Sequence, residues 1–364
     1  MSITRAPGNA DGCAAPSLAP AWTRWYSRRG IVTTTERLKG PLERLYQGFD
    51  YQGRLAHDAI QFPRRYEDPR DREVVALLSA CLAYGRVDLF SREVERLLAI
   101  MGPHPAGFIR AFDPARDAGR FRRFRYRFNR PRDITAFCLT TQRILEAHGS
   151  LRSYFLKGYS DADPDIGPAL ERFVDGIVTQ DLRPVFPRGR PSRGFLHLFP
   201  RPSTGGPCKR LLLFLRWMVR RDRLDFGDWV EVSPSKLLMP IDTHVENMGR
   251  AVGLIRRKSR NWRMAQEVTA RLRRLDPNDP VKYDFALCHK RMSGDCLGRR
   301  HRLVCDPCGL RAVCRHWRGV TEPLNAERGQ AMRNPGGGAR GGVGGTHPPD
   351  KRSARRQDAA RVDD

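Results

Sequence analysis

The sequence predicts an all-α fold for the central part of the chain. Apolar residues recur every three or four positions in eight segments, and the alternating pattern that is typical of strands is nearly absent. In the first segment, one helix face collects Val74, Val75, Leu77, Leu78, Cys81 and Leu82. The eight segments are 71–86, 88–102, 132–149, 168–182, 209–222, 243–253, 261–275 and 280–290.

Local signals mark some of the helix ends. Gly85 is expected to stop the first helix, because glycine is favoured just beyond a helix C-terminus. Asp133 is expected to cap the third helix, since an aspartate oxygen accepts hydrogen bonds from free backbone N–H groups there. A connector rich in proline, arginine and glycine, residues 183–206, separates the fourth helix from the fifth.

The two ends of the chain differ from its centre. The chain has 364 residues, enough for two average domains or for one large domain with tails. Residues 1–36 lack periodicity, and residues 319–364 are rich in glycine, arginine and proline, so neither segment can bury a core. We therefore expect disordered tails at 1–36 and 319–364 and a folded region at 37–318.

The charge balance predicts a polyanionic partner. Lys and Arg number 66 against 40 Asp and Glu, a net charge of +26. Nucleic acid is the first candidate and an anionic membrane surface the second. No run of 18 apolar residues is present, and the N-terminal segment lacks a signal-peptide pattern. We expect a cytoplasmic, nucleoid-associated monomer that binds DNA and does not enter a membrane.

Four cysteines form a group near the end of the central region. The spacing reads Cys296-x8-Cys305-x2-Cys308-x5-Cys314, within a basic and irregular segment. Four thiolates at such spacings can hold a tetrahedral zinc ion or a [4Fe–4S] cluster. The nearby arginines lower the cost of gathering four negative charges, so a metal centre is expected here.

Lys209 is a candidate nucleophile. It follows the turn Gly205-Gly206-Pro207 and falls in the first turn of an apolar helix. A cation there opposes the helix macrodipole, which is expected to lower the pKa of the lysine and to favour its neutral, nucleophilic form. The alternative is that Lys209 and Arg210 contact phosphate or water. In either case Gly205 and Gly206 allow DNA to approach the backbone closely.

Asp242 is the second candidate for chemistry. It stands directly before the segment 243–253, where aspartate is a favoured N-cap, although Thr243 and Glu246 can also form a capping box. A carboxylate at a helix N-terminus stays ionised. The same group can therefore cap the helix and stabilise positive charge in a reaction.

A basic and aromatic segment provides candidate DNA contacts. Residues 120–130 alternate arginine with phenylalanine and tyrosine. Arg122 and Arg125 are expected to bind phosphates while the aromatic rings stack on bases or wedge a duplex open. Alternatively, the rings enter the core and the arginines face water. Arg193, in the connector, is expected to approach the DNA backbone near Lys209.

The segment PIDTHVENMGRAVGL (240–254) resembles a part of helix-hairpin-helix DNA glycosylases that carries their catalytic aspartate in a V-D-x-H-V pattern. Together with the segments 71–86, 208–222 and 279–289, it makes the chain look like a member of an uncharacterised bacterial family, domain of unknown function 2400. That resemblance covers roughly residues 40–318. The cysteine spacings resemble the cluster loop of endonuclease III, which has six residues in the first gap where this chain has eight.

The resemblance implies a two-lobed helix-hairpin-helix fold with a C-terminal cysteine cluster loop. It implies Lys209 as the Schiff-base nucleophile and Asp242 as the essential carboxylate. The two are 33 residues apart, a longer gap than in endonuclease III-like enzymes and similar to that of the archaeal 8-oxoguanine glycosylase branch. Lys236 is a lower-ranked alternative nucleophile, and His244 is expected to be packed and structural. The cluster would be [4Fe–4S], with zinc as the alternative and with Cys288 as a substitute for Cys296.

The implied function is base-excision repair. The protein would act as a DNA glycosylase and AP lyase on a damaged base flipped out of duplex DNA. One alternative is a non-catalytic nucleic-acid-binding protein that keeps the scaffold and a structural Fe–S or zinc site. A second alternative is a zinc-stabilised RNA-processing factor.

Overall fold

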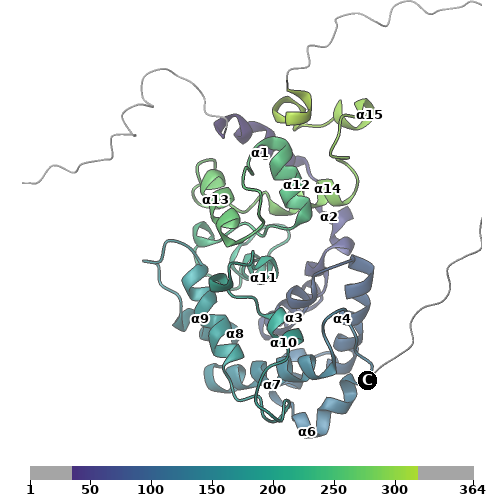
Figure 1. Ribbon diagram of the computed structural model, residues 1–364, viewed down its shortest axis with the longest axis vertical. Coiled ribbons are helices and arrows are strands. Elements are labelled where there is room, and N and C mark those ends of the chain that lie inside the picture. The colour runs from purple at the N-terminus through teal and green to yellow at the C-terminus, as the bar shows by residue number, and fades with distance from the viewer. Residues whose placement is uncertain (1–34, 319–364) are drawn as a thin grey trace, which may run out of the picture. The chain divides into compact units, whose positions relative to one another are not determined.

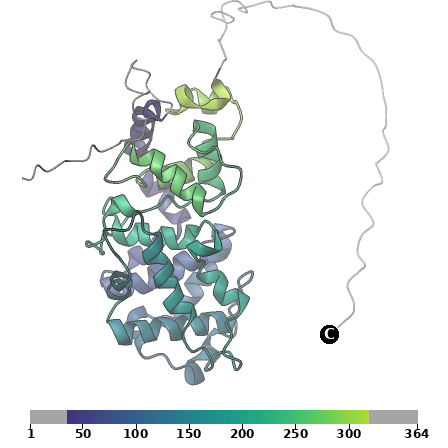
Figure 2. The same cartoon turned by 60° about the vertical axis from the view of Figure 1, so that its left-hand side comes forward.

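The computed structural model describes residues 35–318, and this part of the chain is helical throughout (Figures 1 and 2). It contains no β-strand, only the isolated bridges Tyr126–Asn129 and Arg221–Phe226. The all-α prediction is confirmed for these residues. The expected tails at 1–36 and 319–364 lie outside the described residues, except that Glu36 begins a short 3-10 helix.

The α-helices follow one another with short connections. They are α1 (Lys39–Gly48), α2 (Tyr51–Arg54), α3 (Pro69–Leu82), α4 (Val87–Met101), α5 (Pro105–Arg110), α6 (Pro114–Asp117), α7 (Pro131–His148), α8 (Leu151–Lys157), α9 (Gly167–Val178), α10 (Arg193–Leu198), α11 (Lys209–Val219), α12 (Thr243–Val252), α13 (Trp262–Arg273), α14 (Asp284–Met292) and α15 (Arg302–Cys305). Single turns of 3-10 helix lie between them: η2 (Glu36–Leu38), η3 (Leu55–His57), η4 (Ala59–Gln61), η5 (Pro63–Arg65), η6 (Ala118–Phe121), η7 (Pro202–Thr204), η8 (Pro234–Lys236), η9 (Arg311–Val313) and η10 (Arg315–Trp317).

Two helix-end predictions need correction. Arg130, not Asp133, is the N-cap of α7, and Asp133 sits in the first turn, where its carboxylate accepts the Arg130 N–H at 2.7 Å. Pro131 explains the difference, because proline favours the first helical position and moves the start of the helix towards the N-terminus. The first predicted helix ends at Leu82, before the expected stop at Gly85. Gly85 adopts φ +80° in the following turn.

The centre of the core is formed by α3 and α11. Every residue of α3 from Glu73 to Leu82 is buried, and so is every residue of α11 from Arg210 to Val219. A helix that is covered on all sides belongs in the middle of a helical protein. The two helices pack against each other, and α12 packs against α14 (Figure 1). This packing brings together the starts of α11 and α12, which carry Lys209 and Asp242.

Candidate active site

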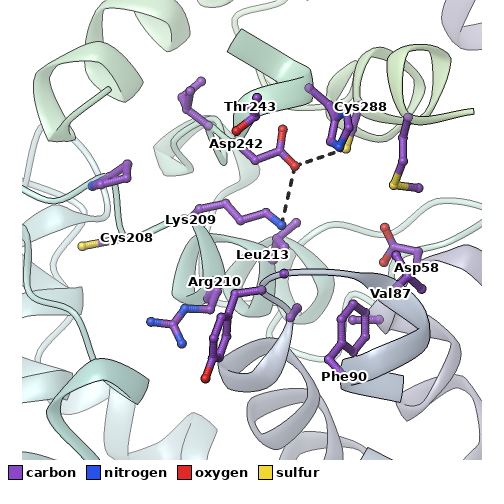
Figure 3. A pocket seen from close by; sticks show the side chains of 18 of the residues that line it. Asp58, Val87, Phe90, Cys208, Lys209, Arg210, Leu213, Asp242, Thr243 and Cys288 are labelled. Carbon is purple, nitrogen blue, oxygen red and sulfur yellow. Dashed lines mark hydrogen bonds and ion pairs between the residues drawn. The ribbon is translucent and has the colours of Figure 1, made fainter. Parts of the chain in front are cut away.

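A pocket of about 680 Å³ opens where several parts of the chain meet. Its walls come from η3–η4, the turn between α3 and α4, the end of α10, the first turns of α11 and α12, and the end of α14. Its size is within the range typical of ligand sites. Lys209, Asp242 and Cys288 all line this pocket (Figure 3).

The turn before α11 positions Lys209. Gly205 adopts φ +76°, and Cys208, the N-cap of α11, adopts φ +46°, a left-handed conformation that is uncommon for a residue with a Cβ. Glu171 anchors the start of this turn by accepting hydrogen bonds from the Ser203 N–H at 2.9 Å and the Ser203 hydroxyl at 2.6 Å. The turn therefore brings Lys209 into α11 with its side chain in the pocket.

Asp242 performs the predicted capping role and also faces the lysine. Its Oδ1 accepts the Val245 N–H at 2.8 Å, so it is the N-cap of α12. Its Oδ2 lies 3.6 Å from Lys209 Nζ (Figure 3). The Lys209 side chain is 27 % exposed and the Asp242 side chain 19 %. The two residues predicted to work together thus form one partly exposed ion pair.

The ionisation of Lys209 differs from the expectation. Burial lowers its pKa, but the nearby negative charges, Asp242 first, outweigh burial and leave the pKa above its ordinary value. Burial raises the pKa of Asp242, and the charge of Lys209 and the Val245 N–H outweigh it, so that pKa is lowered. The macrodipole argument fails because a carboxylate at 3.6 Å acts more strongly than the partial charge of a helix end. Lys209 is therefore protonated at rest.

Cys288 is a third member of this site. Its thiol donates a hydrogen bond to Asp242 Oδ2 at 3.4 Å (Figure 3). Cys288 lines the same pocket as Lys209 and Asp242, and it does not line the separate pocket that the C-terminal cysteines form. Burial, together with the charge of Asp242, raises the pKa of Cys288 well above its usual range, so the group is a thiol. The sequence analysis considered Cys288 only as a possible substitute for the metal ligand Cys296, because spacing alone was available.

Asp58 and His289 were missed by sequence reasoning. Asp58 lines the pocket and lies 3.0 Å from Nε2 of the fully buried His289. Burial raises the pKa of Asp58, but the hydrogen bond and charge of His289 lower it to about 2. Asp58 precedes a short 3-10 turn, where no periodic pattern marks a functional residue.

A family model described as "Protein of unknown function (DUF2400)" matches residues 58–293. The chain belongs to this family. No curated protein and no solved structure matches the chain. The matched segment of the DUF2400 family contains Asp58, Lys209, Asp242 and Cys288, and it ends before Cys296. These four pocket residues are thus within the family region, whereas the four predicted metal ligands lie beyond it.

The other predicted DNA-contacting residues lie in different surroundings. Arg122, Arg125 and Arg193 are exposed, and so is Gly205 in the turn before α11, while Gly206 is partly exposed. Arg210 is buried, and its guanidinium donates to the Cys81 carbonyl at 2.6 Å. Arg210 thus lines the pocket of this DUF2400 protein, but its guanidinium is hydrogen-bonded within the protein and points away from Asp242 (Figure 3).

Two further residues clarify the choice of candidates. Lys236, the alternative nucleophile, does not line the pocket; its Nζ donates to the backbone carbonyls of Asp161 and Asp163 at 2.6 and 2.7 Å. His244 was expected to be a packed, hydrogen-bonded residue rather than a proton shuttle; it is partly exposed and lines the pocket.

The aromatic residues of segment 120–130 divide into two groups. Phe121, Phe124 and Tyr126 are buried, as the core interpretation predicts, while the arginines between them are exposed. Phe128 is the exception, with 59 % of its surface exposed. Its ring lies 6.3 Å from the ring of Tyr84, which lines the pocket.

The four C-terminal cysteines of this DUF2400 chain converge. All four line one small pocket of about 30 Å³ beside α12, the set being Cys296, Cys305, Cys308 and Cys314. Burial raises the pKa of Cys314, and the charges of the other three thiols raise it further, which shows that they are electrostatic neighbours. Among residues 35–318, no group of three or more histidine, cysteine or acidic side chains has the arrangement of a single metal-ion site.

No helix in the described part of the chain is both long and apolar enough to cross a bilayer.

Proposed function

We propose that this protein is a DNA glycosylase and AP lyase that acts on a damaged base in duplex DNA. One observation carries the proposal: Lys209 and Asp242, 33 residues apart in the chain, form a 3.6 Å pair in the wall of a pocket of about 680 Å³. An amine beside a carboxylate, in a cavity that can accept a nucleobase, suits nucleophilic attack on a sugar.

The protonated resting state of Lys209 defines the first step. The ammonium gives its proton to Asp242 Oδ2, and the freed lone pair attacks C1′ of the flipped nucleotide. The bond from C1′ to the base breaks, its electron pair leaves with the base, and the base takes the proton that Asp242 holds. The C1′–O4′ bond then breaks as the attached nitrogen gives one proton, through Asp242, to O4′, and a protonated imine between Lys209 and C1′ remains. Asp242 takes a proton from C2′, and the electron pair of that C–H bond forms the C2′–C3′ double bond as the 3′ phosphate leaves.

Cys288 acts in this scheme as a positioning residue. Asp242 Oδ1 is committed to the cap of α12, and the Cys288 thiol bonds Oδ2 at 3.4 Å. The two bonds fix the plane of the carboxylate, so that Oδ2 stays directed at Lys209. A positioned carboxylate loses less by reorganisation when positive charge develops at the sugar.

Exposed arginines support a duplex partner. Arg122, Arg125, Arg193 and Arg260 are exposed cations, and Arg260 lines the pocket itself. Arginines bind phosphate oxygens and position a protein on DNA without reading its sequence. In the proposal, the chain segment α10–η7–α11 serves as the helix-hairpin-helix element, with Gly205 and Gly206 at the backbone approach and the base held between two lobes.

We also propose a structural [4Fe–4S] cluster held by Cys296, Cys305, Cys308 and Cys314. The donors fit: four thiols line one pocket, and Arg299 and Arg311 border it as cations. Four thiolates can hold a [4Fe–4S] cluster or a zinc ion, and the resemblance of the cysteine spacings to the cluster loop of endonuclease III favours the cluster. When bound, the cluster would cross-link the C-terminal loop.

Metal analysis tests the cluster separately from catalysis. Protein purified without oxygen is expected to contain iron and to absorb in the visible region as [4Fe–4S] proteins do. Cys308→Ser should lower the iron content, whereas Cys288→Ser should leave it unchanged, because Cys288 lies in the other pocket. Stoichiometric zinc without iron would contradict the cluster.

Covalent trapping tests the enzyme proposal. Borohydride reduces an imine to a stable amine, so the protein mixed with duplexes that carry oxidised, deaminated or abasic sites is expected to form a covalent adduct. Lys209→Gln should abolish the adduct. Lys236→Gln is the matched control and should keep it, since Lys236 is outside the pocket. An adduct that survives in Lys209→Gln would refute the assignment.

The resting ion pair gives the non-catalytic alternative a specific basis. A protonated lysine paired with aspartate is also what a purely structural site would contain. In that case the protein would bind duplex DNA with a steep salt dependence. It would form no adduct with any lesion, and Lys209→Gln would leave DNA binding nearly unchanged.

A further inference from the structure

A cluster of aromatic rings forms part of the pocket and has no role in the chemistry proposed above. The rings of Tyr84 and His197 lie 4.7 Å apart, nearly perpendicular, and both residues line the pocket. Phe128 lies 5.1 Å from His197 and is parallel to Tyr84 within 10°. Lys209 and Arg210 are consecutive, and Arg210 reaches this cluster, with its guanidinium 5.0 Å from the Tyr84 ring.

Phe128 is held exposed at the edge of this cluster. The residue before it, Arg127, adopts φ +50°, a strained conformation for a side chain with a Cβ. Tyr126 and Asn129 bond to each other's backbone at 3.2 and 2.8 Å and close a tight turn around Arg127 and Phe128. A strained turn that keeps a large apolar ring in water beside a pocket is typical of a ligand contact rather than of core packing.

The hydrogen-bonding state of His197 follows from its neighbour. Arg210 Nη1 lies 3.4 Å from His197 Nδ1, and a guanidinium can only donate. Nδ1 is therefore the acceptor and Nε2 carries the proton. Burial, with the charges of Arg210 and Arg127, lowers the pKa of His197 to about 4, so the ring is neutral at physiological pH.

The Nε2–H group of His197 is available to a ligand. Among the described residues, no side chain or backbone group makes a hydrogen bond to this atom, and it is not one of the buried polar atoms without a partner. The hydroxyl of Tyr84, in contrast, already donates to Asn129 Oδ1 at 2.6 Å. The cluster thus offers stacking surface and one hydrogen-bond donor of known polarity.

We infer that Tyr84, His197 and Phe128 form a base-binding shelf on which His197 Nε2–H donates to an acceptor of the target base. This inference rests on the proposed function and narrows its substrate class to bases that present a carbonyl oxygen at that position. A base with an amino group there would set one donor against another and leave both unpaired. Such a mismatch discriminates strongly between otherwise similar ligands.

Binding measurements in a non-reacting background test the donor. Lys209→Gln protein is titrated with duplexes that differ in one base: hypoxanthine against adenine, uracil against cytosine, and 8-oxoguanine against guanine. In each pair the first base has a carbonyl oxygen at the position where the second has an amino group or, for guanine, a C8–H. In at least one pair the first base is expected to bind about tenfold tighter than the second. Adding His197→Phe, which keeps a ring but removes the donor, should bring that ratio close to one. His197→Gln, which keeps a donor, should retain part of it.

The exposed ring of Phe128 gives a second test, because removing an exposed ring leaves no cavity in the core. A duplex with 2-aminopurine at a mismatch should lose fluorescence on binding, as the base stacks on the shelf. Phe128→Ala should weaken binding about tenfold and reduce the quenching. Val230→Ala is the control, because Val230 is also exposed and apolar but does not belong to the ring cluster of Tyr84, His197 and Phe128.

The outcomes separate the shelf from the enzyme proposal. Suppose that the wild type forms the borohydride adduct, but that adding His197→Phe to Lys209→Gln leaves the affinity ratio unchanged for all three comparisons of bases. The shelf is then wrong and the enzyme assignment stands. If base discrimination depends on His197 but no adduct forms, the shelf is correct and the lyase assignment is wrong. Equal binding by Phe128→Ala and Val230→Ala would also refute the shelf.

Discussion

Helix α11 carries two sets of cations that meet carboxylates in different ways. At its first residue, Lys209 faces Asp242 at 3.6 Å in a pocket open to solvent. Arg216, two turns later, and Arg220, the C-cap residue of the helix, are buried and pair with four carboxylates, those of Asp222, Asp225, Asp279 and Asp284. One helix therefore joins a sparse, partly exposed pair to a dense, buried network.

The difference concerns how many partners each charge has. Each buried guanidinium is bonded to at least two carboxylates, so each of these charges is held by several partners at once. Lys209 has one carboxylate within ion-pair distance among the described residues, and its side chain is 27 % exposed. The network holds the helix in place, while the amine of Lys209, with a single partner, can move and exchange its proton as the proposed reaction requires.

The largest expected effect is on catalysis at the pocket pair. Asp242→Asn should lower the rate of adduct formation by about 10² to 10⁴, the usual size of acid–base contributions. Stability should change little, because asparagine is also a good N-cap. Single-turnover trapping and urea unfolding of the same variant check both parts. A large loss of stability with an unchanged rate would reverse the roles assigned to the two regions.

The next effect is on stability at the buried network. Arg216→Ala leaves the Asp225 and Asp284 carboxylates without their partner and should cost about 3–5 kcal/mol of the free energy of unfolding. Lys209→Ala, on the same helix, should cost less than about 1 kcal/mol, since its pair is partly exposed. Denaturant titrations measure both. Similar losses in the two variants would show that the pocket pair is also structural.

Acid should act on the pocket wall through Asp58. The folded-state pKa of Asp58 is about 2, below its ordinary value of 3.8. A lowered pKa contributes stability above the unfolded-state value, and this contribution is lost as the pH falls from about 4 towards 2; it amounts to about 2 kcal/mol. Asp58→Asn should flatten the slope of unfolding free energy against pH in that window. An unchanged slope would assign the acid sensitivity to other carboxylates.

The smallest expected effect concerns the thiol that holds Asp242. Cys288→Ala removes the 3.4 Å bond to Oδ2 and should slow trapping by a factor of about three to ten. Cys288→Ser keeps a donor and should restore most of the rate, which a merely space-filling cysteine would not require. The pH profile of trapping should shift in Cys288→Ala only, because the pKa of Asp242 depends on this hydrogen bond.

Local features of the molecule were predictable from the sequence, and relations between distant segments were not. Helical periodicity located eight helices, and the residue type of Asp242 identified an N-cap. The pKa of Lys209 was expected in the wrong direction, because it depends on a carboxylate 33 residues away. Cys288 and Asp58 reach the pocket only through the packing of α14 and η4, which no spacing along the chain records.

The buried position of Arg210 shows the same limit. A cation in a basic segment suggests phosphate binding, but the end of α10 supplies the His197 backbone carbonyl as a hydrogen-bond acceptor and folds over the guanidinium. Whether this side chain faced water or a neighbouring helix depended on a connector that has no periodicity of its own.

Lys209 and Arg210 are neighbours in the chain, and successive residues of a helix point about 100° apart. One reaches Asp242 and the other reaches Tyr84 and His197. A substitution that displaced the start of α11 would therefore move Lys209 from Asp242 and Arg210 from Tyr84 and His197 at the same time.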